Sequence, residues 1–255
     1  MLIRREGAVG FLSLDRPQAL HALTLDMVHA MTGALAGWIA DPAVEAVVID
    51  HAEGRGFCAG GDIAFLRNSA LNDGGVSGRR FFHDEYRLNH LLFSCPKPVI
   101  AFIDGVTMGG GVGLSQPAKF RVATENTRFA MPETGIGLFP DVGGTWLLSR
   151  APGEVGAYLV LTGARMTGAD AILAGFADTF VEAGRLSALA DMLAVAGTVD
   201  QTIAKFTTTP PASAIASLRQ EIDATFGGED VRAILRELAA KIAKIEKTAN
   251  WAAKA

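Results

Sequence analysis

Residues 98–114 read PVIAFIDGVTMGGGVGL, a run of apolar residues that leads directly into a glycine-rich turn. The first six predict a strand buried on both faces, because no polar residue alternates with the apolar ones. A second segment has the same plan: AVVID at 46–50 is followed by the loop GRGFCAGGDI at 54–63. Open α/β sheets bind ligands in the loops that follow parallel strands. The two glycine-rich loops are therefore the predicted place of a ligand site.

Strand and helix patterns alternate on both sides of these segments. The predicted strands are residues 2–14 (a pair that turns at Gly7), 46–50, 98–103, 120–123 and 128–130. The predicted helices are residues 23–40, which Thr24 caps, residues 79–93, two helices that begin at Thr145 and Thr167, and a long amphipathic helix over residues 230–247. This order predicts an α/β domain with a mainly parallel sheet, followed from Gly153 by a helical region.

Three segments have the composition of loops. Residues 64–75 are predicted to be mobile, because Asn, Ser and Gly gather at their end. Residues 132–144, PETGIGLFPDVGG, are predicted to form a loop, and residues 207–211, TTTPP, a linker. We expect an α/β core over residues 1–190 and a helical C-terminal region over residues 191–255.

The bulk composition narrows the class of protein. Hydrophobic residues make up 49% and charged residues 20% of the 255 residues, which is enough for a sizeable core. A net charge of −4 gives no support for a nucleic-acid partner or for binding to an anionic membrane. Residues 1–17 lack the pattern of a secretory signal, and no run of about 18 apolar residues suggests a membrane span. We expect a cytoplasmic protein with reduced cysteines.

The glycine-rich loops are suited to holding a carbonyl oxygen. Glycine lets the backbone approach a ligand closely and releases N–H groups from strand pairing. Two such groups converging on one oxygen would form an oxyanion hole, worth about 3 kcal/mol per donor. A phosphate loop is the poorer alternative, because no Lys-Ser or Lys-Thr pair follows and the G-x-G-x-x-G spacing is absent.

Three carboxylates are candidates for the chemistry. Glu133 and Asp141 lie in the loop 132–144 among apolar residues, where an idle, unpaired acid is costly. Glu85 lies in the predicted helix 79–93, and by its position alone a solvated helix face is the better interpretation. The five histidines show no metal-ligand spacing, so we predict no metal site. Cys58 is interpreted as a packing residue.

Several motifs, in this order, resemble the enoyl-CoA hydratase/isomerase (crotonase) superfamily over roughly residues 8–185. They begin with LDRP at 14–17 and ALT at 22–24 and end with TGARMTGADAILAGFADTFV at 162–181. Within the superfamily, three segments are most similar to 3-hydroxyisobutyryl-CoA hydrolases: GFCAGGDI at 56–63, SCPKPVIAFIDGVTMGGGVGLS at 94–115 and FAMPETGIGLFPDVGG at 129–144. The last of these is the most specific.

The resemblance implies a crotonase-like spiral of ββα units with a helical C-terminal region. It also implies that the N–H groups of Gly61 and Gly110 hold a thioester oxygen and that CoA, as part of the substrate, binds near the first turn without a separate cofactor. Glu133 matches the catalytic glutamate, Asp141 the second acid of the hydrolases, and Glu85 a glutamate that contacts the substrate. The pathway implied is valine breakdown, and the assembly implied is a homotrimer or a dimer of trimers.

Two departures from the family pattern affect the expected reaction. Hydratases of the superfamily use two glutamates, and the place of the first one is Gly113 here. Hydration across a double bond benefits from an acid and a base on one face of the substrate. Hydrolysis of a thioester, by contrast, tolerates the loss of the first glutamate. The chain is also shorter than such hydrolases, so the C-terminal region is expected to be shortened.

Three functions stay open on these grounds. The first is hydrolysis of 3-hydroxyisobutyryl-CoA or a similar short 3-hydroxyacyl-CoA. The second is hydration or double-bond isomerisation with Glu133 alone. The third is a weakly active CoA-binding paralogue.

Overall fold

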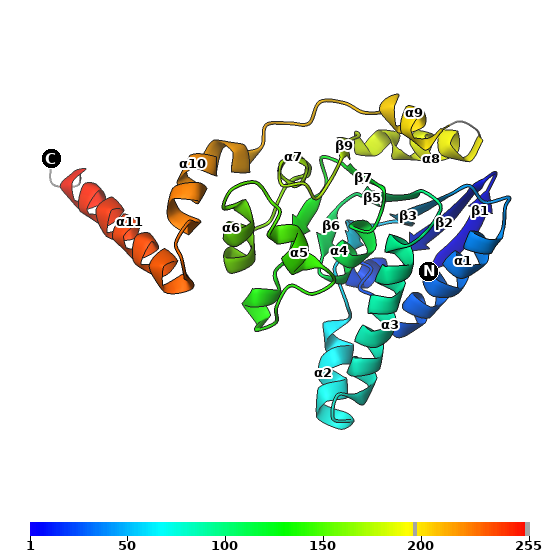
Figure 1. Ribbon diagram of the computed structural model, residues 1–255, viewed down its shortest axis with the longest axis horizontal. Helices are drawn as coiled ribbons and strands as arrows, with labels where there is room; N and C mark the ends of the chain where they lie inside the picture. The colour runs from blue at the N-terminus through cyan, green and yellow to red at the C-terminus, as the bar shows by residue number, and fades with distance from the viewer. Residues whose placement is uncertain (196–197, 253–255) are drawn as a thin grey trace.

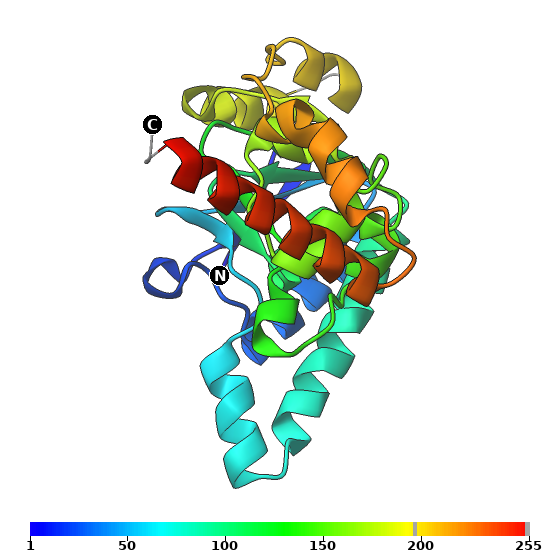
Figure 2. The same cartoon turned by 90° about the vertical axis from the view of Figure 1, so that its left-hand side faces the viewer.

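The computed structural model describes residues 1–195 and 198–252 and is drawn in Figures 1 and 2. One sheet has six strands in the order β1-β2-β3-β5-β7-β9, and a second has three in the order β4-β6-β8. All neighbouring strands are parallel except β1 and β2. The strands are β1 (Leu2–Glu6), β2 (Val9–Leu14), β3 (Ala46–His51), β4 (Gly56–Cys58), β5 (Val99–Ile103), β6 (Val106–Met108), β7 (Phe120–Ala123), β8 (Arg128–Ala130) and β9 (Thr179–Phe180).

The helices fill the intervals between these strands and make up most of the C-terminal part. They are α1 (Leu25–Ala40), α2 (Ile63–Asn72), α3 (Val76–Phe93), α4 (Gly110–Ser115), α5 (Gly144–Leu148), α6 (Val155–Thr162), α7 (Gly168–Leu173), α8 (Leu186–Val195), α9 (Val199–Ala204), α10 (Ala214–Phe226) and α11 (Val231–Ala252). The predicted α/β fold with a mainly parallel sheet and a helical C-terminal region is confirmed. Within the described residues, no helix is both long enough and apolar enough to span a bilayer.

Local signals placed the first elements correctly. Gly7 turns the chain between β1 and β2 with a φ of 55°, a conformation that costs glycine little. Thr24 caps α1 by accepting a hydrogen bond from the Met27 N–H at 3.3 Å. Residues 46–49 and 99–103 are buried throughout, as expected of strands covered on both faces.

The segment predicted to be mobile, residues 64–75, is largely helical, and that prediction is wrong. Asp62 caps α2 by accepting a hydrogen bond from the Phe65 N–H at 3.1 Å, and α2 packs against α3. The Asn, Asp and Gly residues end the helix instead: Gly74 and Gly75 turn the chain into α3 with φ values of 64° and 80°. This helical hairpin projects downwards in Figure 1.

The two glycine-rich loops also contain regular structure that the sequence did not reveal. Residues 56–58 and 106–108 form β4 and β6, which pair with each other and, through β6, with β8. Strands of three residues are too short for a periodic pattern, and only their pairing stabilises them. The second sheet brings the two loops side by side.

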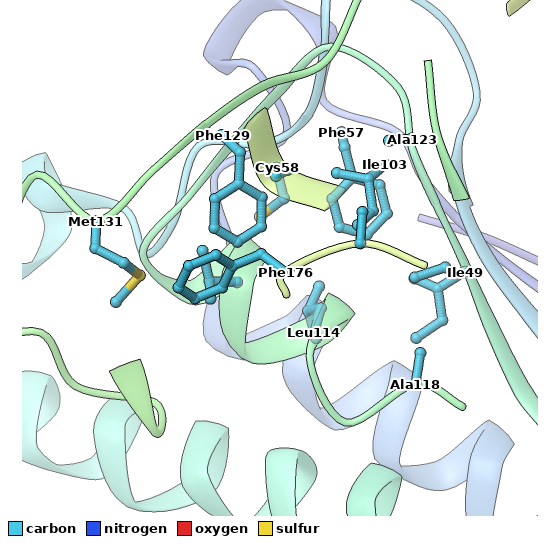
Figure 3. Packing of buried hydrophobic residues seen from close by; sticks show 14 of the residues in the cluster. Ile49, Phe57, Cys58, Ile103, Leu114, Ala118, Ala123, Phe129, Met131 and Phe176 are labelled. Atoms are coloured by element: carbon cyan, nitrogen blue, oxygen red, sulfur yellow. The ribbon is translucent and has the colours of Figure 1, made fainter. Parts of the chain in front are cut away.

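The core lies on both faces of the larger sheet. One cluster packs β2, β3 and β5 against α1 and α3 and continues through Phe129 and Phe176, whose rings lie 5.2 Å apart (Figure 3). A second cluster packs the opposite face against α8 and α9, which lie above the sheet in Figure 1. Helix α10 joins the first cluster through Ile215, Ile222 and Phe226.

The chain between α9 and α10, which includes the predicted linker 207–211, has no regular secondary structure. Helix α8 runs through residue 190, and the division of the chain at that residue stays a prediction.

Candidate functional site

A cavity of about 250 Å³ lies between the two glycine-rich loops, α3 and the loop 132–144. Its lining includes all five residues selected from the sequence: Gly61, Glu85, Gly110, Glu133 and Asp141. These residues come from three different helices or turns and two loops, so the fold brings together what the chain separates. Their individual roles stay predictions.

The two glycine turns touch each other at this cavity. A Cβ built on Gly110 would lie 3.3 Å from the Gly61 nitrogen, and one built on Gly60 would lie 3.4 Å from the Gly110 nitrogen. Gly60 and Gly109 have φ values of 104° and 49°, which favour glycine at both positions.

The backbone pairing leaves both predicted donors free. Leu23 bonds the residues on either side of Gly61: its N–H donates to the Gly60 oxygen at 2.7 Å, and its oxygen accepts from the Asp62 N–H at 3.1 Å. Gly110 is the first residue of α4, where N–H groups lack an intrahelical acceptor. Across the described parts of the chain, neither N–H has a backbone acceptor, so both are available to a ligand oxygen.

Glu133 begins the short 3-10 turn that follows β8. Its side chain is buried, and a Cβ on Gly109 would lie 3.1 Å from its Oε1. Its Oε2 is buried with no hydrogen-bond partner in the described structure. Burial raises the pKa of Glu133 to about 7, a backbone hydrogen bond opposes the rise, and the charge of Asp141 adds to it. At neutral pH this carboxyl group is thus poised between its two protonation states.

Glu85 lies on the buried face of α3, and the solvated helix face favoured by its position alone is wrong. It is 2% exposed, and its Oε1 has no partner among the described residues. Burial raises its pKa to about 8, with a further contribution from the charge of Asp141. The signal was present in the sequence, because Glu85 falls in register with the buried residues Phe81, Leu88 and Leu92.

Close packing also explains why residue 110 is glycine. A Cβ on Gly110 would overlap Oε1 of Glu85 and would lie 3.2 Å from Leu23 Cδ1. A side chain there would require the Glu85 carboxyl group to move.

Asp141 is held by a residue that the sequence interpretation missed. The Tyr86 hydroxyl donates a hydrogen bond of 2.7 Å to Asp141 Oδ2. Burial raises the pKa of Tyr86 above its usual value, and the hydrogen bond to Asp141 raises it further, so Tyr86 keeps its proton. No single-sequence pattern connects residues 55 positions apart, and only the fold reveals this pair.

Gly113 stands where hydratases of the superfamily have their first glutamate, and neighbouring side chains pack against it. A Cβ on Gly113 would lie 2.9 Å from Val142 Cβ and 3.0 Å from Asn89 Nδ2. Asn89 donates to the Gly113 oxygen at 3.0 Å. A side chain at residue 113 would therefore require Val142 and Asn89 to move.

Within residues 1–195 and 198–252, no group of three or more His, Cys, Asp or Glu side chains is arranged to hold a metal ion. Cys58 is fully buried, and burial raises the pKa of its thiol to about 12, which suits packing rather than attack on a substrate.

Comparison with known proteins gives a consistent picture. Residues 9–255 match the family described as enoyl-CoA hydratase/isomerase. The 3-hydroxyisobutyryl-CoA hydrolase, mitochondrial, of Xenopus laevis is 50% identical over 192 residues, which are 74% of this chain and 49% of that protein. The human protein of the same name is 45% identical over 205 residues, 80% of this chain and 53% of that protein.

A solved structure supports the predicted spiral fold. The crystal structure of a carnitinyl-CoA dehydratase from Mycobacterium thermoresistibile has a TM-score of 0.90 and 46% identity, covering 94% of this chain and 70% of that one. The crotonase-like fold is therefore confirmed. The chain spans about half the length of the curated relatives it matches.

The expected cytoplasmic location is wrong. The curated relatives carry names that place them in mitochondria. Comparing residues 1–17 with a secretory signal does not distinguish the cytoplasm from a mitochondrion, which is why the sequence argument failed.

Proposed function

This chain belongs to the enoyl-CoA hydratase/isomerase family, and from that premise we propose that it hydrolyses the thioester of 3-hydroxyisobutyryl-CoA or a similar short 3-hydroxyacyl-CoA. The observation that carries the proposal is the cavity in which the backbone N–H groups of Gly61 and Gly110, which have no backbone acceptor among the described residues, border the carboxyl group of Glu133 with its unpaired Oε2. Curated relatives named as 3-hydroxyisobutyryl-CoA hydrolases support the substrate class.

The two glycine donors polarise the thioester. Each donates a hydrogen bond to the carbonyl oxygen and stabilises the negative charge that develops there when the carbonyl carbon is attacked. The site is buried and largely apolar, so these hydrogen bonds are stronger than they would be in water.

The ionised carboxylate of Glu133 acts either as the nucleophile or as the general base. In one route, it attacks the carbonyl carbon, the C–S bond breaks, and water then opens the resulting mixed anhydride. In the other route, it takes a proton from a water molecule that attacks directly. Both routes need Glu133 ionised at the start, and both release the CoA thiol and the free hydroxy acid.

Glu85 and Asp141 bind the acyl group in this proposal. Glu85 keeps its proton at neutral pH and donates a hydrogen bond, whereas Asp141, oriented by Tyr86, accepts one from the 3-hydroxyl group. A substrate with a hydroxyl group at this carbon satisfies both side chains, and one without it leaves a buried polar group unpaired.

Hydration is the competing reaction. Gly113 carries no carboxyl group at the place where hydratases of the family have their first glutamate, and Val142 packs against it, which favours hydrolysis. A weakly active CoA-binding protein is the remaining alternative. Incubation with 3-hydroxyisobutyryl-CoA and with crotonyl-CoA separates the three: hydrolysis releases free thiol, hydration removes enoyl absorbance without thiol, and a binding protein does neither.

The residue-level test is Glu133→Gln. We expect thioester cleavage to fall at least about 100-fold with the fold retained, because the amide neither attacks nor accepts a proton. Glu45→Gln, a change at an exposed glutamate, is the matched control and should keep full activity. Near-normal turnover of the Glu133 variant would rule out the proposed mechanism.

We also propose that the chain assembles as a homotrimer or a dimer of trimers. Exposed apolar side chains on α11, among them Leu235 and Ile242, support association with other chains.

A further inference from the structure

A second cavity, of about 420 Å³ and widely open to solvent, lies next to the reaction cavity. Its walls are the last turns of α3 and the second half of the loop 132–144. Apolar side chains supply most of the lining, including Phe93, Phe139, Pro140 and Val142. His90 and Asp141 also line this cavity, but its larger apolar part suits an alkyl chain.

The two cavities meet at Asp141. Helix α3 lines the reaction cavity through Phe82 and Glu85 and the second cavity, one turn further on, through Tyr86 and Asn89. Asp141 lines both. The hydrogen bond from Tyr86 to Asp141 therefore spans the boundary between α3 and the loop at the place where the cavities adjoin.

Packing holds the Tyr86 ring in place independently of its hydroxyl group. Its centroid lies 5.9 Å from that of Phe82, one helical turn earlier on α3. Phe82 in turn lies against Phe81, with their centroids 5.7 Å apart. The ring is thus anchored by aromatic contacts at one end and by Asp141 at the other.

We propose that Tyr86, bonded to Asp141, is the partition that ends the acyl subsite and sets the preference for short acyl groups. Removing the ring joins the two cavities, and the second cavity then receives the tail of a longer 3-hydroxyacyl thioester. The proposal rests on the proposed function, because it concerns the acyl end of the same substrate. The reaction catalysed is unchanged.

The test compares 3-hydroxyoctanoyl-CoA with 3-hydroxyisobutyryl-CoA by the ratio of their kcat/KM values. Each methylene buried in an apolar cavity improves binding about fourfold, so we expect Tyr86→Ala to raise the ratio at least about tenfold. Tyr86→Phe keeps the ring and should leave the ratio within about threefold of the wild type. The proposal would be overturned if the kcat/KM ratio rose equally in both variants, or if it did not rise in Tyr86→Ala.

A second variant locates the tail. Thr145 lines the second cavity and is exposed, so Thr145→Phe narrows that cavity without disturbing the core. When Thr145→Phe is combined with Tyr86→Ala, it should remove most of the increase in kcat/KM for 3-hydroxyoctanoyl-CoA. It should leave kcat/KM for 3-hydroxyisobutyryl-CoA unchanged. A gain that survives Thr145→Phe would mean that the tail lies elsewhere, and the proposal would fail.

Binding measurements keep this test separate from the hydrolase assignment. The unreactive thioethers S-ethyl-CoA and S-octyl-CoA require no chemistry, and calorimetry gives their affinities for each folded variant. If the wild type cleaves neither thioester, the proposed function fails, while a selective gain in S-octyl-CoA affinity for Tyr86→Ala still supports the partition. If the wild type cleaves the short thioester but Tyr86→Ala gains no S-octyl-CoA affinity, only the partition fails.

Discussion

Three carboxyl groups, those of Glu85, Glu133 and Asp141, line one small cavity. Burial raises the pKa of Glu133 to about 7 and that of Glu85 to about 8, and the charge of Asp141 raises both further. Asp141 itself accepts a hydrogen bond from Tyr86. Carboxyl groups whose pKa values lie near neutral pH are suited to acid and base roles. Here Glu133 is assigned the base or nucleophile and Glu85 the protonated donor.

The pH dependence of kcat/KM follows from Glu133. We expect the rate to rise with pH through about 7, because only the ionised carboxylate attacks or accepts a proton. Asp141→Asn removes a negative charge that raises the pKa of Glu133, so the rising limb should move to lower pH as the maximal rate falls. Steady-state kinetics between about pH 5 and 9 measure both effects. An unmoved limb in Asp141→Asn would contradict the electrostatic coupling.

Glu85 should lower stability at high pH. Below its unfolded pKa of 4.5, the group is protonated in both the folded and the unfolded chain. Between 4.5 and about 8, only the unfolded chain ionises, so the free energy of unfolding falls by about 1.4 kcal/mol per pH unit from this group.

Glu85→Gln removes that loss and so tests the buried carboxyl group directly. We expect the variant to be more stable than the wild type at pH values near or above about 8, by several kcal/mol at most, while its activity falls. Urea unfolding at a series of pH values gives the difference. A constant difference between the two proteins across this range would contradict the prediction.

At the scale of elements, one aspartate connects two helices of the C-terminal region. Asp170 forms a capping box with Thr167 at the start of α7 and also accepts hydrogen bonds from Ser213 Oγ at 2.6 Å and the Ile215 N–H at 3.0 Å at the start of α10. Burial opposes ionisation of this carboxyl group, but the hydrogen bonds, that from Ser213 first, hold its pKa below the usual value. The sequence identified the cap on α7 but not its contact with α10.

Asp170→Ala should therefore destabilise more than the loss of a cap alone. We expect a cost of about 2–4 kcal/mol, because the buried Ile215 N–H loses its acceptor. Thr167→Ala, which removes only the capping side chain, should cost about 1 kcal/mol. Denaturant unfolding of both variants gives the comparison. Equal costs would show that the connection to α10 contributes nothing.

At the scale of the whole molecule, α11 carries an uncovered apolar stripe. Val231, Leu235 and Ile242 are spaced four and seven residues apart and are each at least half exposed, at 50%, 58% and 56%. This spacing places them along one side of the helix, as in helices that pack against a partner. Figure 2 shows α11 lying on the outside of the molecule.

The proposed trimer or dimer of trimers comes from the family resemblance, and this stripe is the surface that we expect the assembly to bury. Sedimentation velocity should give a mass of three or six chains for the wild type. The double change Leu235→Lys and Ile242→Lys should shift the distribution towards smaller species, because two charges would be buried unpaired in the contact. Arg236→Gln, at an exposed polar position of the same helix, is the control. A wild type that stays monomeric at all concentrations would contradict the proposed assembly.

Local sequence patterns were enough to predict the α/β class, most of the strands of the larger sheet, and the two glycine-rich loops at their ends. These features depend on local patterns: continuous apolar runs, helical periodicity and glycine at turns. The five selected site residues could also be predicted from the sequence, because each lies in a short segment that resembles a family motif. Residues 64–75 were misread, since a capping aspartate outweighed the turn-forming residues near their end.

The burial, pKa values and hydrogen-bond partners of these residues depend on the tertiary fold. It formed the second sheet from strands of three residues, left the Gly61 and Gly110 N–H groups without acceptors, and joined Tyr86 to Asp141. It also buried Glu85 beside Gly110 and filled the space at Gly113 with Val142. The physical reason is that burial, pKa and hydrogen-bond partners depend on contacts between distant segments, which no local pattern along the chain encodes.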